Sequence, residues 1–571
     1  MTATSRIYRK RDYLLGDIVN SKTTAVGKPA MSYYDVYNPG YSSFKSSYAK
    51  RRTVVYAGSN DGMLHAFDGT LPGYVATTSN ETTTTTDSDC TFCGQELFAY
   101  VPSFVYGTST TAATSGLASV GSPTRSHYYQ VDATPLDIDV DLNNVCTADT
   151  SGTAAACSKI NTSTPDWRTL LIGGLGKGGK GFYAIDVTNP GSVTSTSTTS
   201  GSATTVTKTL TSGDWTTETA VATKVLWEFP KTTDTTTIAR MGYSYGAPTF
   251  LKTKKYGWVV VFTSGYNNSD GKGYFFFVNP RTGTLLETVA TSEGSTTTPL
   301  NLTQADAYIP NLADFTGDAI YAGDLQGNLW RLDVSNSTAT YSAPVKLATL
   351  YKTAGTPQPV TTRPLIEIDP TTSKRFVLVG TGRLLADSDV KSTAIQSVYS
   401  VYDGAKGFGL FKAASAYATP LTRSDLVANT SVVDGIGSTP ATSAGWYVDL
   451  SVASSSPYIA ERVNVDPTAD NGSAFFGVNL PNGSTCSPSG TGYILGFNIA
   501  TGKSVLQDSD GTFIAKSTTM AGVITDLSVQ NVNGKLRVIA GDSTGTTATT
   551  PSALTTSTGL KRMNWREVPT Q

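Results

Sequence analysis

One phrase recurs along the chain and limits what the chain can fold into. Its clearest copy is Ile320–Val334, IYAGDLQGNLWRLDV. Two short runs flank a polar turn, Gly323–Asn328, and the second run alternates between polar and apolar side chains. Such alternation after a Gly- and Asn-containing turn is typical of a β-hairpin. Six further stretches resemble it: Val54–Thr70, Leu170–Gly191, Val259–Leu286, Phe376–Gly404, Ala474–Val505 and a weaker one that begins at Leu536.

Repeated units that cannot bury a core alone predict an array or a propeller. Seven antiparallel units favour an all-β fold, a seven-bladed β-propeller with long loop insertions. The predicted division is a lead-in over residues 1–50, with a closing strand at Leu14–Val19, and a propeller over 51–571. Insertions are expected near 71–95, 108–125, 191–224 and 411–445. The Ser/Thr-rich insertion 191–224 is either a long surface hairpin or a mobile segment.

Composition and charge exclude several functions. The formal net charge is −1 and 15% of the 571 residues are charged, so the chain lacks the basic footprint of a nucleic-acid-binding protein. No apolar run approaches the ~18 residues that a membrane-spanning helix needs. The first residues, MTATSRIYRKRDYLLGD, are basic but have no apolar core of the kind a signal peptide requires.

The chain has five cysteines, which is few for its length. Cys146 and Cys157 flank a polar loop and are predicted to form a local disulfide if the protein is exported. Cys90 and Cys93 form a single CxxC, which is weak evidence for zinc without a second pair. They are the second disulfide candidate. Cys486 has no assigned partner.

Glycines dominate one turn, Gly174–Gly181, GLGKGGKG. It matches part of a P-loop and also GxGxxG, but both nucleotide-binding motifs need a helix directly after the glycines. The residues that follow, FYAIDV, alternate like a strand. We therefore predict a glycine-rich hairpin turn and no phosphate site.

Two acidic stretches resemble calcium-binding loops in the spacing of their acidic residues. Asp137, Asp139, Asp141 and Asn143 alternate with apolar residues, which favours one exposed face of a strand. The second stretch is Asp314–Asp318.

In that second stretch, Asp314, Thr316 and Asp318 offer oxygen ligands directly before the Ile320 hairpin, but calcium takes ~6–8 oxygens. The alternative is an Asp-Gly turn. The only two histidines, His65 and His127, lie beside no recognisable catalytic set. His65 is predicted to be a partly buried structural residue, and the chain is predicted to be no enzyme.

Taken in order, several motifs resemble the PilC/PilY family of type IV pilus biogenesis factors and tip adhesins. They are VVYAGSNDGMLHAFDG, HYYQVDATP, WRTLLIGGLGKGGKGFYAIDVT, SGYNNSDGKGYFFFVNPRTG, IYAGDLQGNLWRLD and a final WRE. The likeness runs from about Leu14 to Glu567. It implies a modified seven-bladed propeller from the C-terminal part of an exported protein, and hence that a signal and an N-terminal domain are missing from this chain.

The resemblance also carries expectations about function. It implies a non-enzymatic factor for pilus assembly, surface attachment and twitching motility, located at the pilus tip or outer membrane, with minor pilins and a host or abiotic surface as partners. Family members have a calcium loop here. Asp318 matches its final Asp and Asp314 its first, but the loop in this chain is shorter and lacks the middle ligands, so weak calcium binding or none is expected.

A rival from another class shares the repeat. Pyrroloquinoline-quinone-dependent dehydrogenases resemble this chain in their propeller phrases, but many of them carry adjacent cysteines, and this chain has none. No quinone cofactor is therefore expected.

Overall fold

The structure is a computed structural model. It describes residues 13–71, 85–86, 92–106, 116–122, 127–147, 158–159, 164–200, 203–337, 340–353, 355–406, 420–430, 444–452, 460–484, 487–532 and 535–553. The predicted insertions near 71–95, 108–125 and 411–445 lie mostly outside these residues.

Seven sheets follow one another in chain order, and each contains one of the seven predicted hairpins as an antiparallel pair. The all-β prediction is therefore confirmed. In spatial order, the first sheet is β1 (Thr24–Val26), β2 (Val54–Gly58), β3 (Leu64–Asp68) and β5 (Glu96–Tyr100), the second is β6 (Leu136–Asp141), β9 (Trp167–Gly174), β10 (Phe182–Asp186) and β13 (Val225–Phe229), and the third is β14 (Thr249–Thr253), β15 (Gly257–Thr263), β16 (Tyr274–Val278) and β17 (Leu285–Ala290). The fourth sheet is β18 (Leu302–Tyr308), β19 (Ala319–Asp324), β20 (Asn328–Asp333) and β21 (Val345–Thr349), and the fifth is β24 (Leu365–Ile368), β25 (Lys374–Gly380), β26 (Ser397–Lys406), β28 (Gly445–Asp449) and β27 (Val427–Ala428). The sixth sheet is β29 (Thr468–Asp470), β30 (Ser473–Ser484) and β31 (Ser487–Asn498), and the seventh is β32 (Ile524–Val532), β33 (Lys535–Asp542) and β34 (Thr547–Ser552).

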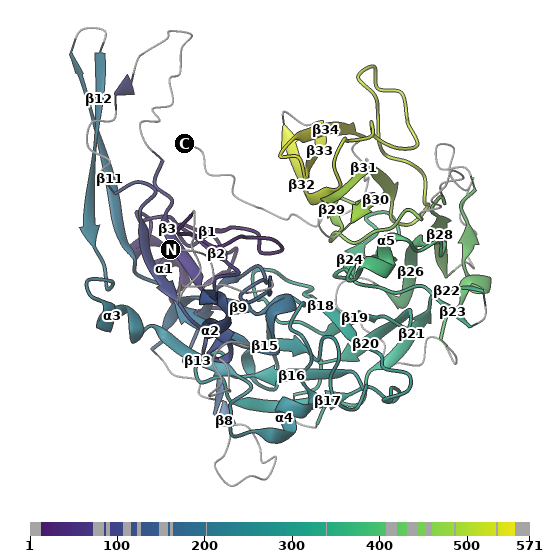
Figure 1. Cartoon of the computed structure of the whole chain (residues 1–571), viewed down its shortest axis with the longest axis horizontal. Coiled ribbons are helices and arrows are strands. Elements are labelled where there is room, and N and C mark those ends of the chain that lie inside the picture. The colour runs from purple at the N-terminus through teal and green to yellow at the C-terminus, as the bar shows by residue number, and fades with distance from the viewer. Residues whose placement is uncertain are drawn as a thin grey trace.

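Most of the first strands of neighbouring sheets contact one another. Contacts join β1 to β6, β14 to β18, β18 to β24, β24 to β29, and β29 to β32. Figure 1 shows the sheets following an arc from the N-terminal sheet to the C-terminal one. An ion pair of 2.6 Å between Lys22, just ahead of β1, and Asp526 of β32 links the two ends of this series. The first strands therefore face the centre of the arrangement.

Smaller elements lie outside these sheets. The Ser/Thr-rich segment forms a hairpin of β11 (Gly191–Ser200) and β12 (Ala203–Ser212), and β4 (Thr85–Thr86) pairs with β12. The hairpin projects far from the sheets (Figure 1). Two short strand pairs are also present, β7 (Cys146–Thr147) with β8 (Ser158–Lys159) and β22 (Tyr351–Thr353) with β23 (Thr356–Pro357). The helices are α1 (Tyr41–Ser47), α2 (Gly116–Gly121), α3 (Glu218–Ala222), α4 (Thr235–Arg240) and α5 (Asp387–Val390). The 3-10 turns are η2 (Ser103–Val105), η3 (Gly176–Gly178) and η4 (Arg423–Asp425).

The core lies between consecutive sheets. One cluster joins Phe275 and Phe277 of β16 to Ile320 of β19 and Trp330 of β20, and all four are fully buried. Burying a large apolar side chain contributes roughly 1.5–3 kcal/mol. Each cluster draws on at least two sheets, so neighbouring sheets share their hydrophobic core.

The lead-in differs from its prediction. Leu14–Val19 forms no strand; instead it crosses the β2–β3 turn, where Gly16 N–H donates to Asp61 at 2.8 Å and Asn60 N–H donates to the Asp17 carbonyl. The lead-in does supply a strand, but it is β1 at Thr24–Val26, which pairs with β2. The backbone groups of Leu14–Val19 therefore bond to the Asp61-Gly62 turn between β2 and β3 and not to a neighbouring strand. No helix of the described residues is long and apolar enough to cross a membrane.

Candidate functional site

The predicted metal-binding residues lie in the loop between β18 and β19. Phe315 holds a left-handed backbone conformation, with φ of 68°, and its ring packs 5.2 Å from Tyr33 and 5.6 Å from Trp258. The backbone is tied to β14, because Lys252 N–H donates to the Phe315 carbonyl and Gly317 N–H donates to the Lys252 carbonyl. An aromatic anchor and two hydrogen bonds therefore fix the loop.

The Asp314 carboxylate faces a lysine from β14. Lys252 Nζ lies 2.7 Å from Asp314 Oδ1, and it also donates to Asn38 Oδ1 at 2.9 Å and to the Tyr37 carbonyl at 3.2 Å. The ammonium sits 5.8 Å from the centre of the Trp258 ring, a cation–π distance. The side chain of Lys252 is only 7% exposed, so these oxygens replace its hydration.

The Asp318 carboxylate turns to a different cation. Arg375 Nη2 of β25 lies 3.2 Å from Asp318 Oδ2, while Asp318 Oδ1 is buried and has no hydrogen-bond partner among the described residues. Arg375 also lies 3.5 Å from Asp403 and 3.6 Å above the ring of Tyr308. Burial raises the pKa of Asp318 to about 6, although Arg375 acts in the opposite direction.

A buried ion network continues from Asp318 into the core. Asp403 is fully buried and accepts hydrogen bonds from Tyr321 at 2.6 Å and from Arg331. Arg375 donates to the Tyr321 hydroxyl at 3.1 Å. This network joins the fourth sheet to the fifth, and Asp318 is its outermost acid.

The loop therefore separates the three predicted ligands. Asp314 points to Lys252, Asp318 points to Arg375, and Thr316 pairs its backbone with Lys252. Nowhere in the described part of the chain do three or more His, Cys, Asp or Glu side chains gather as a metal-binding group. Such an arrangement falls short of the ~6–8 oxygens that calcium takes, so these residues do not fit the ion.

Sequence reasoning missed the cations of this site. Lys252 is one of three lysines in the segment TFLKTKKYGW, and nothing in the sequence distinguishes it, the buried one, from Lys254 or Lys255. Arg331 gave a weak signal, since it alternates with Trp330 and Leu332 in a strand whose neighbours are apolar.

The acidic run in β6 is a strand as predicted, but its exposure was predicted wrongly. Asp139 is 3% exposed and accepts hydrogen bonds from Tyr41 at 2.7 Å and Thr169 at 2.5 Å. Burial, together with Asp139, raises the pKa of Asp137 to about 6. The lead-in and α1 cover this strand, so both faces are buried.

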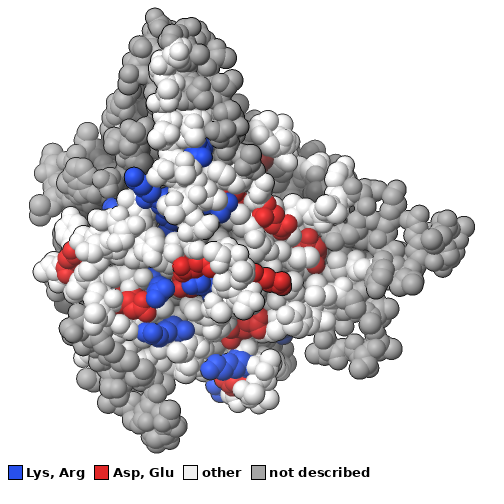
Figure 2. All heavy atoms as spheres, turned by 90° about the vertical axis from the view of Figure 1, so that its left-hand side faces the viewer, with Lys and Arg blue, Asp and Glu red and all other residues white. Residues whose placement is uncertain are grey.

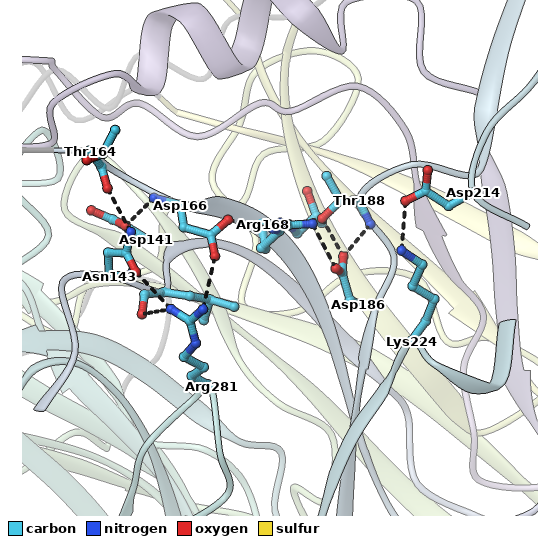
Figure 3. Close-up of polar contacts among 12 residues, drawn as sticks. Asp141, Asn143, Thr164, Asp166, Arg168, Asp186, Thr188, Asp214, Lys224 and Arg281 are labelled. Atoms are coloured by element: carbon cyan, nitrogen blue, oxygen red, sulfur yellow. Dashed lines mark hydrogen bonds and ion pairs between the residues drawn. The ribbon is translucent and has the colours of Figure 1, made fainter. Parts of the chain in front are cut away.

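Beside that strand, charges are paired with one another. Asp141 Oδ1 accepts the backbone N–H groups of Asn143 and Asp166 at 3.0 and 2.8 Å. Figure 3 shows Asp166 facing Arg281, Asp186 facing Arg168 and Asp214 facing Lys224. On the face drawn in Figure 2, charges of both signs are likewise interspersed. We find no calcium-like arrangement in this network.

The glycine-rich turn Gly174–Gly181 connects β9 to β10, and a strand follows it, as predicted. His65 is 5% exposed and lies between Glu96, at 2.6 Å, and Asp61, at 3.2 Å. These two acids raise the pKa of His65 although burial acts against them. His127 is exposed and pairs with Asp17 at 2.7 Å.

Two of the cysteines are disulfide-bonded, Cys93 and Cys146. Their predicted partners, Cys90 and Cys157, lie outside the described residues, as does Cys486. The pairings Cys146–Cys157 and Cys90–Cys93 therefore stay predictions.

The seven consecutive sheets define an all-β protein of the propeller class. The family model of the PilY1 beta-propeller domain matches residues 15–104 and 149–432. The chain belongs to this family.

Relatives and a solved structure agree with that assignment. The type IV pilus biogenesis factor PilY1 of Pseudomonas aeruginosa (strain UCBPP-PA14) is 26% identical over 560 residues, covering 87% of this chain and 40% of that protein. A PilY1 homolog of Xylella fastidiosa is 28% identical, covering 98% of this chain and 39% of that protein. The chain thus spans about two fifths of these curated relatives. The crystal structure of the Pseudomonas aeruginosa PilY1 C-terminal domain matches 92% of this chain and 99% of that chain, with a TM-score of 0.59 and 22% identity, and supports the fold alone.

Proposed function

We propose that this chain is the propeller part of a type IV pilus biogenesis factor that acts by binding and not by catalysis. The observation that carries the proposal is the family match over residues 15–104 and 149–432. The names of the relatives supply the biological role, since both are pilus biogenesis factors. Closed propellers suit binding because rigid sheets support loops that tolerate change, and binding residues concentrate on such loops.

The finer role is attachment at the pilus tip, where the propeller contacts minor pilins and a host or abiotic surface and supports twitching motility. The exposed hairpin β11–β12 supports this role, because it projects from the sheets and consists mainly of Ser and Thr (Figure 1). Location at the cell surface or pilus tip follows from the same proposal.

On this proposal the loop from Asn311 to Asp318 works without calcium. The support is that Asp314 and Asp318 are already neutralised by Lys252 and Arg375. A divalent ion would have to displace a buried ammonium that three oxygens hold, and leaving a buried charge unpaired is costly. Calcium control of the pilus is therefore not part of the proposed function.

The test is a deletion of the full-length gene in its own strain, complemented with the wild-type gene. We expect fewer surface pili and weaker attachment in the deletion, with both restored by the complementing copy. Normal piliation and attachment in the deletion strain would overturn the proposal.

A biochemical arm separates binding from catalysis. The purified chain, incubated with pyrroloquinoline quinone and a panel of alcohols and sugars, should show no dye reduction above the quinone alone. Sustained turnover in this assay would favour the dehydrogenase alternative instead.

A further inference from the structure

Three loops from the first half of the chain meet at one end of the sheets. They are residues 127–132 ahead of β6, the glycine-rich turn 174–181 between β9 and β10, and residues 243–245 ahead of β14. Asp132 N–H donates to the Leu175 carbonyl at 3.2 Å, and Ser244 N–H donates to the Gly179 carbonyl at 3.0 Å. The glycine-rich turn is therefore clamped between the other two loops.

Close packing explains why this turn is so rich in glycine. A Cβ at Gly178 would lie 1.8 Å from the Gln130 carbonyl oxygen, and Gly176 has a φ of +59° that favours glycine. Between Gly176 and Gly181, the only residues other than glycine are Lys177 and Lys180. The backbone thus approaches its neighbours closely while two ammonium groups stand at the surface.

Each of these lysines lies over a tyrosine ring of a neighbouring loop. Lys177 Nζ is 4.4 Å from the centre of the Tyr129 ring, and Lys180 Nζ is 5.5 Å from the centre of the Tyr243 ring. Lys180 also donates to the Asn267 carbonyl at 2.6 Å. Within the described residues neither lysine forms an ion pair with a carboxylate. Burial lowers the pKa of Lys180, as expected for an ammonium without an anionic partner.

A third tyrosine joins the two lysine–tyrosine pairs. Tyr245 N–H donates to the Tyr243 carbonyl at 3.0 Å, and the Tyr245 ring lies 4.9 Å from that of Tyr266. Burial, with Asp132, Tyr129 and Tyr243 nearby, raises the pKa of Tyr245. We name Tyr129, Lys177, Lys180, Tyr243 and Tyr245 the Tyr–Lys site.

The polar groups of this site are open to a ligand. Among the described residues, the hydroxyls of its three tyrosines have no hydrogen-bond partner. The acid beneath the site, Asp132, is 2% exposed and its carboxylate accepts two hydrogen bonds from Asn20, at 2.6 and 3.2 Å. Burial raises the pKa of Asp132, while Asn20 and the nearby Lys177 act in the opposite direction. Asp132 therefore presents no carboxylate at the surface that would compete with an incoming anion.

We propose that the Tyr–Lys site binds an acidic glycan, with the carboxylate or sulfate of a sugar at the two ammonium groups and sugar hydroxyls at the tyrosine hydroxyls. Charge-assisted hydrogen bonds to an anion are about twice as strong as neutral ones, and the free hydroxyls match sugar hydroxyls. A protein partner is less well matched, because a specific protein interface buries on the order of 1,200–2,000 Å². Five side chains provide far less. This inference goes beyond the proposed pilus role and does not depend on it.

The test is calorimetry of the purified chain with an oligogalacturonate and with a heparin-derived oligosaccharide, to distinguish carboxylate from sulfate. A maltooligosaccharide of equal length is the neutral control and hexaglutamate is the acidic-peptide control. We expect binding of at least one acidic oligosaccharide that weakens as salt is added, and no binding of the neutral one.

Two variants and one matched control assign the binding to this site. The double variant Lys177→Ala/Lys180→Ala should weaken the affinity for the acidic oligosaccharide roughly tenfold or more. Tyr245→Phe should weaken it less. Lys503→Ala, which removes an exposed lysine from a turn near the other end of the chain, should leave it unchanged. Circular dichroism melts check that each variant is folded.

Three results would overturn the inference. They are no binding of either acidic oligosaccharide at about millimolar concentration, equal affinity in the folded double variant, or tighter binding of hexaglutamate. Because the readout is binding in solution, any of these leaves the pilus role to be judged by the deletion strain.

Discussion

Lysines serve opposite purposes beside two loops of this protein, the β18–β19 loop and the glycine-rich turn. Lys252 is buried, and a carboxylate, an amide oxygen and a carbonyl oxygen hold its ammonium. Lys177 and Lys180 lie over tyrosine rings without a carboxylate partner among the described residues. A buried charge needs partners, whereas a partly exposed charge without one remains available for a ligand. The loop that resembles a metal site is thus occupied by the protein's own cation, whereas the glycine-rich turn presents two ammonium groups that form no ion pair among the described residues.

The largest effect is expected from removing the buried lysine. Lys252→Met keeps the aliphatic length but leaves Asp314, Asn38 and the Tyr37 carbonyl without their shared donor. We expect the free energy of unfolding to fall by about 2–4 kcal/mol, measured by urea denaturation. Lys254→Met, two residues away and exposed, is the matched control and should change it by less than about 0.5 kcal/mol. Equal effects of the two variants would remove the contrast between the loops.

Removing the acid should cost less than removing the lysine. Asp314 is about one third exposed, so Asp314→Asn leaves Lys252 with its two other oxygens. We expect a loss of roughly 1–2 kcal/mol. In a double-mutant cycle with Lys252→Met, the coupling energy should be about 0.5–3 kcal/mol, as for residues in contact. A coupling of zero would mean that the two groups do not form a pair in solution.

The pH dependence of stability reports on Asp318. Its pKa is raised to about 6 in the folded protein, against about 3.9 for an unfolded Asp. The folded state therefore holds the proton more tightly, and the contribution of Asp318 to stability falls as the pH rises from about 4 to about 6. Above pH 6 its contribution is constant.

The effect is measured as a difference between two proteins. Urea unfolding of wild type and of Asp318→Asn across this window should show a steeper decline for wild type, by at most about 1.4 kcal/mol per pH unit. Parallel curves for the two proteins would show that Asp318 is ionised throughout, as a metal ligand would be.

The smallest effect should come from a lysine of the Tyr–Lys site. Lys180→Met removes an ammonium whose pKa is lowered by burial and which has one carbonyl acceptor. We expect the free energy of unfolding to change by less than about 0.5 kcal/mol in thermal or urea denaturation. A loss as large as that of Lys252→Met would show that Lys180 is structural.

Sequence periodicity was sufficient to predict the hairpins but not the structure of the loops between them. All seven repeated phrases form antiparallel pairs because a strand's alternation is written in consecutive residues. The strand predicted at Leu14–Val19 was wrong, because its backbone bonds go to a turn distant in sequence.

The partners of the charged residues could not be predicted from the sequence either. Lys252 lies in β14 and Arg375 in β25, whereas Asp314 and Asp318 lie in the loop between β18 and β19, so no local pattern relates either acid to its cation. For the same reason Asp139 was expected at the surface, since its covering residue Tyr41 belongs to the lead-in. Local spacing identified which residues had ligand chemistry, and only tertiary contacts decided whether they were already neutralised.

The most direct measurement is isothermal calorimetry of the purified chain with calcium, after dialysis against a chelator, with melting curves in calcium and in chelator alongside. If Lys252 and Arg375 neutralise the loop, there is no saturable heat and the melting temperature is the same in both buffers. Tight, saturable binding that raises the melting temperature and disappears in Asp318→Asn would contradict this account.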